Sequence, residues 1–229
     1  VVLGRGHPRP RVLIGRDTRA SGPALEEALL AGIARAGGEG LRAGVIPTAG
    51  VAHLTGAYEC QAGAVISASH NPYPDNGIKF FDREGGKLSD ALEERIEAHL
   101  DEPAITRDSH ALGRAKRLES AIEQYQAFCI GTVGPDLRLD GLKVVVDCSH
   151  GAGYKVAPRT LAELGAEIIP IGCSPNGRNI NEGCGSTHPD LLPLMVKGSG
   201  ADIGVAFDGD GDRVVMVDHL GNLIDGDQL

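Results

Sequence analysis

Short apolar runs and helix-like segments alternate along the chain, and the alternation restarts once near its middle. Arg11–Gly15, for example, is an apolar run that ends in glycine, as expected of a buried strand. Such alternation is typical of mostly parallel sheets covered by helices. Strands are predicted at residues 11–15, 41–46, 62–66, 77–81, 143–147, 167–171, 201–207 and 213–217, and helices after residues 21 and 48, at 89–100, from 120, at 157–164 and at 189–196.

Two of these helices begin with capping signals. Ser21 is a residue type that favours the N-cap position, and Ser120 with Glu123 has the spacing of a capping box. The leucines of the first helix recur at helical spacing, which places Glu26 and Glu27 on the opposite face. We therefore expect both glutamates to face solvent.

A polar segment separates the two alternations. Residues 102–117 contain Pro, Asp, Ser and Gly together with a basic cluster that we expect to be a solvated face: Arg114, Lys116 and Arg117. The fold predicted is α/β, with two successive similar domains whose mixed, mostly parallel sheets are covered by helices. The domains are predicted at residues 1–117 and 118–229.

Composition limits the partners that the chain can have. Lys plus Arg number 22 and Asp plus Glu 31, a formal net charge of −9 that argues against nucleic acid and anionic membranes. No apolar run approaches 18 residues, and no signal-peptide pattern is visible. The five cysteines form no C-x-x-C pair, so reduced thiols in a cytoplasmic protein are expected.

The strongest local signal is the acidic segment Asp208–Arg213, in which three aspartates alternate with two glycines. Three neighbouring carboxylates repel one another unless a cation lies among them, and glycines let the backbone curl around a hard divalent ion. A calcium EF-hand would need Gly and Glu where Arg213 and His219 stand. The remaining alternatives are a metal loop after a strand and a purely structural polar turn.

A second signal is Ser69-His70-Asn71-Pro72, directly after a predicted strand. Proline ends the strand and turns the chain, which exposes the serine, and Lys79 follows ten residues later. Serine and histidine that are adjacent in sequence cannot form the usual catalytic triad. Taken alone, a phosphate-carrying serine and a polar turn with a hydrogen-bonded histidine are equally good explanations.

Nucleotide-binding fingerprints are absent. Gly151 and Gly153 are followed by Val156 where a dinucleotide-binding motif needs its third glycine. Gly86-Lys87 lacks the first glycine and the final Ser or Thr of a Walker loop. We therefore expect no nucleotide cofactor.

Together, the serine and acidic motifs resemble those of the α-D-phosphohexomutases. The resemblance extends over nearly the whole chain. The residues around the two motifs are most similar to those of the bacterial amino-sugar branch of that family. Further matching segments are Gly15–Gly22, Asp75–Phe81, Pro175-Asn-Gly177 and Asn179-Ile-Asn181.

The resemblance implies a role for each motif. Ser69 would carry the phosphoryl group, phosphorylated Ser69 being the active form. One Mg²⁺ would be bound by Asp208, Asp210 and Asp212, with a phosphate oxygen on Ser69 as a further ligand. Because phosphoryl transfer depends on charge neutralisation, additional cationic groups are needed near this anionic cluster.

The candidates for these groups flank the two motifs. We expect His70, Lys79 and Arg213 to steady the transferred phosphate, and Lys79 or His70 to move the hydroxyl proton. Arg16 and Arg19 are secondary candidates for positioning phosphate. A structural salt bridge to an acid such as Asp17 explains Arg19 equally well.

The activity implied is the interconversion of glucosamine 6-phosphate and glucosamine 1-phosphate through a bisphosphorylated sugar. The alternative within the family is phosphomannomutase or phosphoglucomutase activity. From another class, the alternative is a non-catalytic α/β module that binds Mg²⁺ or Ca²⁺. A phosphatase with an acidic metal loop ranks lower, because it would use an aspartate nucleophile.

Parts of the family pattern are missing from the sequence. An N-terminal segment like F-G-T-D-G-I-R-G and the third and fourth domains, which recognise the sugar and its distal phosphate, are not found. We therefore expect the chain to be a fragment of a longer cytoplasmic enzyme, with a phosphosugar as substrate and a homodimer implied for the full-length form. The chain alone is expected to have little or no mutase activity.

Overall fold

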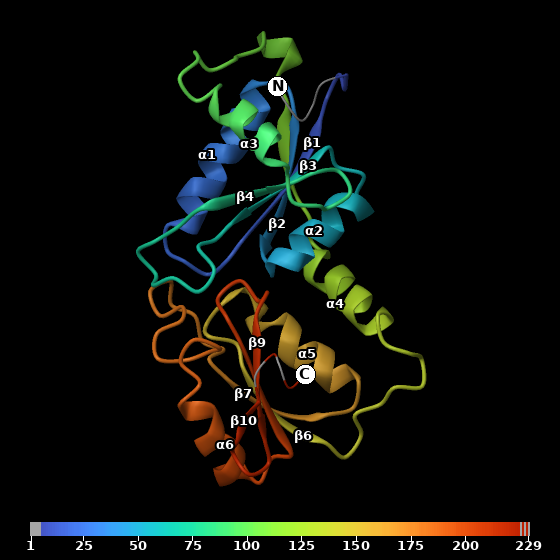
Figure 1. Ribbon diagram of the computed structural model, residues 1–229. Helices are drawn as coiled ribbons and strands as arrows, with labels where there is room; N and C mark the ends of the chain where they lie inside the picture. The colour runs from blue at the N-terminus through green and yellow to red at the C-terminus, as the bar shows by residue number, and fades with distance from the viewer. Residues whose placement is uncertain (1–5, 225, 227, 229) are drawn as a thin grey trace.

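The computed structural model describes residues 6–224, 226 and 228. Within them, the strands form two five-stranded sheets, which lie one above the other with their connecting loops facing (Figure 1). Each sheet has helices packed on both faces. The predicted fold class, two α/β units with mixed sheets, is confirmed.

The first sheet has the strand order β4-β3-β1-β2-β5. All its neighbouring strands are parallel except β3 and β4. Adjacent side chains of the central strand point to opposite faces, so Leu13 packs under α2 while Ile14 packs under α1. The bounds are β1 (Arg11–Arg16), α1 (Gly22–Arg35), β2 (Glu39–Val45), α2 (Thr48–Ala57), β3 (Ala62–Ile66), β4 (Ile78–Phe81), α3 (Asp90–Glu97) and β5 (Arg114–Arg117).

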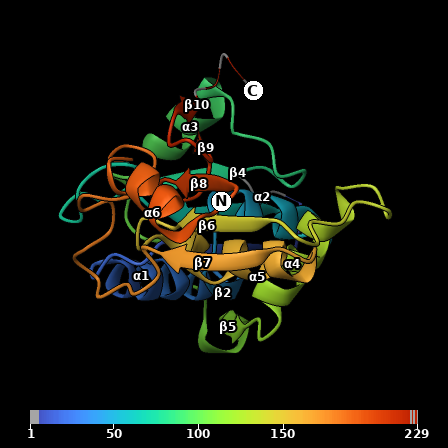
Figure 2. The same ribbon diagram turned by 90° about the horizontal axis from the view of Figure 1, so that it is seen from below.

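The second sheet repeats this design with the order β10-β9-β8-β6-β7. Figure 2 shows β6 running beside β7, its parallel neighbour. Val145 of β6 packs with α6, and its neighbours Val144 and Val146 pack on the α5 side. The bounds are β6 (Lys143–Asp147), α5 (Val156–Glu163), β7 (Glu167–Ile171), α6 (Leu191–Ser199), β8 (Ile203–Phe207), β9 (Val214–Asp218) and β10 (Leu223–Ile224).

Helix α4 (Ala121–Gly131) joins the two halves. Its buried Ala121 and Tyr125 belong to the same apolar cluster as Leu54 of α2 and Val156 of α5. Burial of apolar surface therefore continues across the junction of the two sheets. Figure 1 shows α4 running from the first sheet toward the second.

The predicted starts of two helices are confirmed, whereas the predicted capping box and the predicted exposure of Glu26 are wrong. Ser21 and Ser120 stand at N-cap positions, but neither side chain makes a capping hydrogen bond. Ser120 instead accepts a hydrogen bond from Gln124, so the expected capping box with Glu123 is not formed. Glu26 is only 3% exposed because its carboxylate forms ion pairs with arginines of β1 and β2.

The basic cluster at residues 114–117 is a strand rather than part of a linker. Its side chains are exposed, as expected, but its backbone pairs with β2 as the edge strand β5. Arg114 and Lys116 approach Oε1 of Glu39 to 2.7 and 2.9 Å. Backbone hydrogen bonds to β2 and ion pairs with Glu39 therefore both attach the edge strand to the sheet.

Among the helices that the structure describes, none is both long and apolar enough to span a bilayer.

Replacing Glu39 by Gln tests how much the ion pairs of Glu39 stabilise the attachment of the edge strand β5. The hydrogen bond from Lys116, followed by that from Arg114, lowers the pKa of Glu39 despite partial burial. The ionised glutamate therefore stabilises the fold above its unfolded-state pKa, and this contribution is lost as pH falls through the lower folded-state pKa. Because both cations are half-exposed, we expect Glu39→Gln to cost about 1 kcal/mol at pH 7.

Urea unfolding at several pH values measures this cost, which should shrink progressively as the pH falls below the ordinary pKa of glutamate. Glu119→Gln is the control, because the pair that Glu119 forms with Arg117 is largely exposed. Equal losses in the two variants, or a loss from Glu39→Gln that does not change with pH, would contradict the proposed attachment.

Candidate functional site

The serine and acidic motifs meet where the two sheets face each other. The serine motif follows the carboxyl end of β3, and the acidic motif follows the carboxyl end of β8. Open α/β sheets place their binding sites at these ends. Ser69 and Asp208, which are 139 residues apart in sequence, are in direct contact: Oγ of Ser69 donates a 2.6 Å hydrogen bond to Oδ2 of Asp208.

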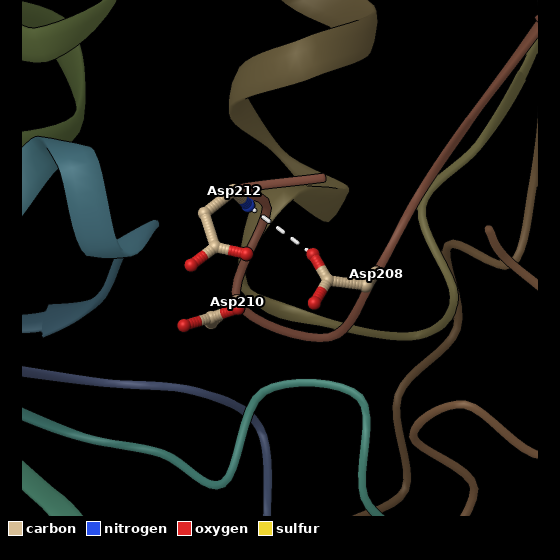
Figure 3. Close-up of side chains that lie close together, drawn as sticks. All are labelled: Asp208, Asp210 and Asp212. Atoms are coloured by element: carbon tan, nitrogen blue, oxygen red, sulfur yellow. Dashed lines mark hydrogen bonds between the residues drawn. The ribbon is translucent and has the colours of Figure 1, made fainter. Parts of the chain in front are cut away.

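The three aspartates of the acidic loop converge. One carboxylate oxygen from each of Asp208, Asp210 and Asp212 lies within 4.8 Å of the others. Figure 3 shows the loop curled around them, with the backbone N–H of Asp212 donating to Oδ1 of Asp208 at 3.2 Å. The N–H of Arg213 donates to the same oxygen, also at 3.2 Å. The predicted gathering of these side chains is therefore present in the structure.

Both glycines of the acidic loop are needed for this shape. A Cβ on Gly209 would lie 2.6 Å from the carbonyl oxygen of Ser69, too close for any side chain. Gly211 has a φ of +73°, a left-handed conformation that glycine adopts without steric cost. The glycines thus allow both the curl of the loop and its close approach to the serine motif.

Asp210 is fully buried, with one carboxylate oxygen engaged and one without a partner. Its Oδ2 accepts hydrogen bonds from Thr48 at 2.6 Å and from Lys79 at 3.0 Å. Burial alone would raise the pKa of Asp210, but these donors outweigh it and hold the pKa below the ordinary value. Within the described residues, Oδ1 of Asp210 is buried and has no hydrogen-bond partner.

Asp212 has the opposite electrostatic balance. Burial, followed by the charges of Asp210 and Asp208, raises its pKa, and Lys79 opposes the rise at 3.8 Å. The Asp212 side chain is 38% exposed. The acidic loop therefore carries unrelieved repulsion at its outer edge.

A hard divalent cation fits these donors. Three carboxylates converge, one buried oxygen is unpartnered, and oxygen ligands are those that Mg²⁺ and Ca²⁺ prefer. Lys79 and Arg213 offset only part of the charge of the three carboxylates, so the loop retains a net negative charge. A divalent cation would neutralise that charge.

The serine loop is held in an uncommon conformation. Ser69 is 7% exposed and has a φ of +50°, in the left-handed region that few non-glycine residues occupy. Its N–H donates to Oγ of Ser67, and that hydroxyl donates to Asp17 at 2.6 Å. The hydroxyl of Ser69 is thereby left free to contact the acidic loop.

Arg19 binds the backbone of the serine loop. Its Nε donates to Asp17 at 2.8 Å, so the salt-bridge alternative for this residue is realised. The remaining donors bind backbone oxygens of the loop, those of Ser69, Asn71, Pro72 and Asp75. All five guanidinium N–H groups are therefore used within the protein, and none is left for a phosphate.

Asn181 supports the same loop from the other half of the molecule. Its Nδ2 donates to the carbonyl oxygens of Ser69 and Asn71 at 2.9 and 3.1 Å. We assigned no role to this residue from the sequence, because nothing in its spacing indicated a contact 112 residues away. Asn181 is buried and has a φ of +59°. Its two hydrogen bonds connect the second half of the molecule to the backbone of the serine motif.

The other predicted residues surround the site at different distances. Lys79 of β4 contacts two of the aspartates and is 44% exposed. Arg213 is 53% exposed, with Nε 4.0 Å from Asp212. The His70 side chain is exposed and forms no hydrogen bond with any described residue. Arg16 is directed away, its guanidinium bonded to Glu26 and to the carbonyl of Asp17.

Curated relatives match almost the entire chain. The phosphoglucosamine mutase of Chromobacterium violaceum is 56% identical over 221 residues, which are 96% of this chain and 50% of the relative. That of Acidovorax ebreus is 54% identical over 228 residues, 100% of this chain and 51% of the relative. The chain thus spans about half the length of the curated relatives it matches.

Solved structures agree with the fold. A phosphoglucomutase/phosphomannomutase family protein from Burkholderia thailandensis superposes with a TM-score of 0.79 at 28% identity, over 97% of this chain and 51% of that one. Pp63/parafusin, a phosphoglucomutase from Paramecium, gives 0.72 at 17% identity, over 96% and 48% of the two chains. At 17% identity, the likeness to parafusin supports the fold alone.

Family models account for both halves. The model of phosphoglucomutase/phosphomannomutase α/β/α domain I matches residues 2–106, and that of domain II matches residues 123–221. The first match contains the serine motif, and the second contains the acidic loop. With these matches in sequence and in fold, the chain belongs to the phosphoglucomutase/phosphomannomutase family.

Proposed function

We propose that this chain supplies the phosphoryl-transfer site of a phosphoglucosamine mutase, which interconverts glucosamine 6-phosphate and glucosamine 1-phosphate. The observation that carries the proposal is the 2.6 Å contact between Oγ of Ser69 and Asp208, where the two halves meet. It places a serine hydroxyl beside the oxygen cluster that fits a divalent cation. The names of the curated relatives support the choice of sugar.

In this proposal the cation is Mg²⁺, held by Asp208, Asp210, Asp212 and a phosphate oxygen on Ser69. When bound, Mg²⁺ would supply positive charge to the transferring phosphoryl group. The chain's own contribution is to hold the three carboxylates and the serine at one point. The pairing of Asp210 with Thr48 and Lys79 favours its ionised form, as a ligand requires.

The basic residues around the site would have different roles in phosphoryl transfer. Lys79 is paired with two carboxylates, which suits an ammonium that offsets charge rather than a base. Arg213, half-exposed beside the loop, could contact an incoming phosphate. His70 is exposed next to Ser69 and forms no hydrogen bond with the residues that the structure describes, so it is the better candidate to take the proton of the attacking sugar hydroxyl.

The reaction begins and ends with phosphorylated Ser69. The phosphoryl group leaves Oγ for a sugar hydroxyl, which gives up its proton to a base as the new P–O bond forms, and Oγ takes up a proton as the old P–O bond breaks. The bisphosphorylated sugar then reorients, and its other phosphate returns to Ser69. A specificity for mannose or glucose phosphates is the alternative within the same chemistry.

Phosphate on Ser69 is the first expected outcome. Intact-mass and peptide mass spectrometry should detect it on the natively expressed full-length enzyme, or after that enzyme is incubated with Mg²⁺ and glucosamine or glucose 1,6-bisphosphate. Ser69→Ala should show none at this site. Ser21→Ala, which removes an exposed serine at the start of α1, should be modified like the unaltered chain.

A full-length enzyme whose Ser69 stays unmodified under all these conditions would refute its role as phosphate carrier and favour a non-catalytic module. Comparing mannose 1,6-bisphosphate with the glucosamine compound as donor to the full-length enzyme tests the choice of sugar. Faster phosphorylation by the mannose compound would contradict the glucosamine assignment while leaving the carrier role intact.

The acidic loop predicts opposite effects of Asp212→Asn with and without Mg²⁺. Without metal, the substitution removes repulsion that raises the pKa of Asp212, so Tm should rise by about 1–2 °C. With Mg²⁺ at about 100 times its Kd, the unaltered chain should gain about 2.7 kcal/mol, or about 5–10 °C in Tm. The variant should lose most of that gain.

Thermal unfolding by circular dichroism, with Mg²⁺ or with EDTA, measures both effects. Asp136→Asn is the control, because Asp136 is exposed and outside the cluster, and it should behave like the unaltered chain. If Mg²⁺ does not raise the Tm of the unaltered chain, the proposed metal site is contradicted.

A further inference from the structure

Thr48 contacts the acidic loop at two points. Its backbone N–H donates to the carbonyl oxygen of Asp210 at 3.0 Å, and its hydroxyl donates to Oδ2 of the same residue at 2.6 Å. Thr48 and Asp210 are 162 residues apart, one in each half of the molecule. Both donors come from one residue and both acceptors belong to one residue, so the contact fixes backbone and side chain together.

The position of Thr48 at the first residue of α2 explains why its N–H is available. The first N–H groups of a helix have no partner within that helix. Those of Gly50 and Val51 are paired with the carbonyl of Pro47, whereas that of Thr48 is paired with the acidic loop. The positive end of the α2 dipole is thus directed at a buried carboxylate.

The hydroxyl of Thr48 also determines which oxygen of Asp210 remains free. Oδ2 is occupied by Thr48 and Lys79, while Oδ1 is buried and without a partner among the described residues. A carboxylate held by one oxygen cannot rotate freely, so the second oxygen keeps a fixed direction. One carboxylate oxygen of Asp210 lies within 4.8 Å of an oxygen of each of the other two aspartates, so the buried, unpartnered Oδ1 belongs to a carboxylate of the convergent cluster.

We propose that Thr48 is a positioning residue for the divalent cation: it anchors Asp210 by two hydrogen bonds so that Oδ1 is presented as a preformed ligand. The inference rests on the cation site of the proposed function and adds to it a contribution from the first half of the molecule. Thr48 itself does not touch the cation.

Thr55 provides a matched control on the same helix. It is fully buried, and its hydroxyl donates to the carbonyl of Val51 within α2 at 2.7 Å. Thr55→Val therefore removes a buried hydroxyl from α2 without affecting the acidic loop. Thr48→Val removes the hydroxyl bond to Asp210, and Thr48→Ser retains it.

Isothermal titration of the whole chain with MgCl₂ tests the proposal. Thr48→Val should bind Mg²⁺ about 10- to 100-fold more weakly, the usual effect of losing a residue that orients a metal ligand. Thr48→Ser should stay within about twofold of the unaltered chain, and so should Thr55→Val. Circular dichroism before each titration establishes that the variant is folded, and Thr48→Ala replaces Thr48→Val if the latter does not fold.

The outcomes separate the two proposals. If the unaltered chain does not bind Mg²⁺, the cation site itself is wrong. If the unaltered chain binds and Thr48→Val binds equally well, the cation site stands and the role of Thr48 is overturned. Equal weakening in Thr55→Val, or in Thr48→Ser, would likewise overturn it, because the effect would then not depend on the hydroxyl bond to Asp210.

Discussion

Mutual repulsion among three carboxylates is the constraint on which the rest of this site depends. The acidic loop brings one oxygen of each aspartate within 4.8 Å of the others, and two cations oppose them: Lys79, which pairs with Asp210 and Asp212, and Arg213, which lies 4.0 Å from Asp212. Backbone N–H groups, the Thr48 hydroxyl and the Ser69 hydroxyl supply further donors. These donors come from both halves of the molecule, so the cluster is stable only where the halves meet. The charge that remains is what makes a divalent cation the natural occupant.

The serine loop is held by a complementary arrangement, in which cationic and amide donors bind backbone oxygens. The carbonyls of Ser69 and Asn71 each accept from Arg19 of the first half and from Asn181 of the second. This double support explains how Ser69 keeps a left-handed backbone despite its side chain. It also explains why Arg19, in the charged neighbourhood of the site, serves the loop rather than an incoming phosphate. A side chain with five fixed donors is better suited to this task than lysine.

The sequence predicted those parts of the fold and site that depend on local pattern. Strand β6 was predicted with its observed bounds because its apolar run is uninterrupted. The meeting of Ser69 with the aspartates was expected from the resemblance to the phosphohexomutases. Strand β5 was missed because its side chains are basic and exposed, and only backbone pairing with β2 defines it. Thr48 and Asn181 were missed because they act across 162 and 112 residues. The domain boundary after residue 117 stays a prediction.

The two halves resemble each other in design, but they contribute different chemistry. Each places a functional loop at the carboxyl end of a strand that pairs in parallel with the first strand of its sheet: β3 beside β1 and β8 beside β6. The first half provides the serine and Lys79, and the second provides the aspartates and Asn181. Each half also orients the other's functional group, Thr48 acting on Asp210 and Asn181 acting on the Ser69 backbone. Because the orienting contacts cross the junction in both directions, any relative movement of the halves would alter the serine and the cation ligands together. A shared junction of this kind keeps the phosphate carrier and its counter-charge in one geometry.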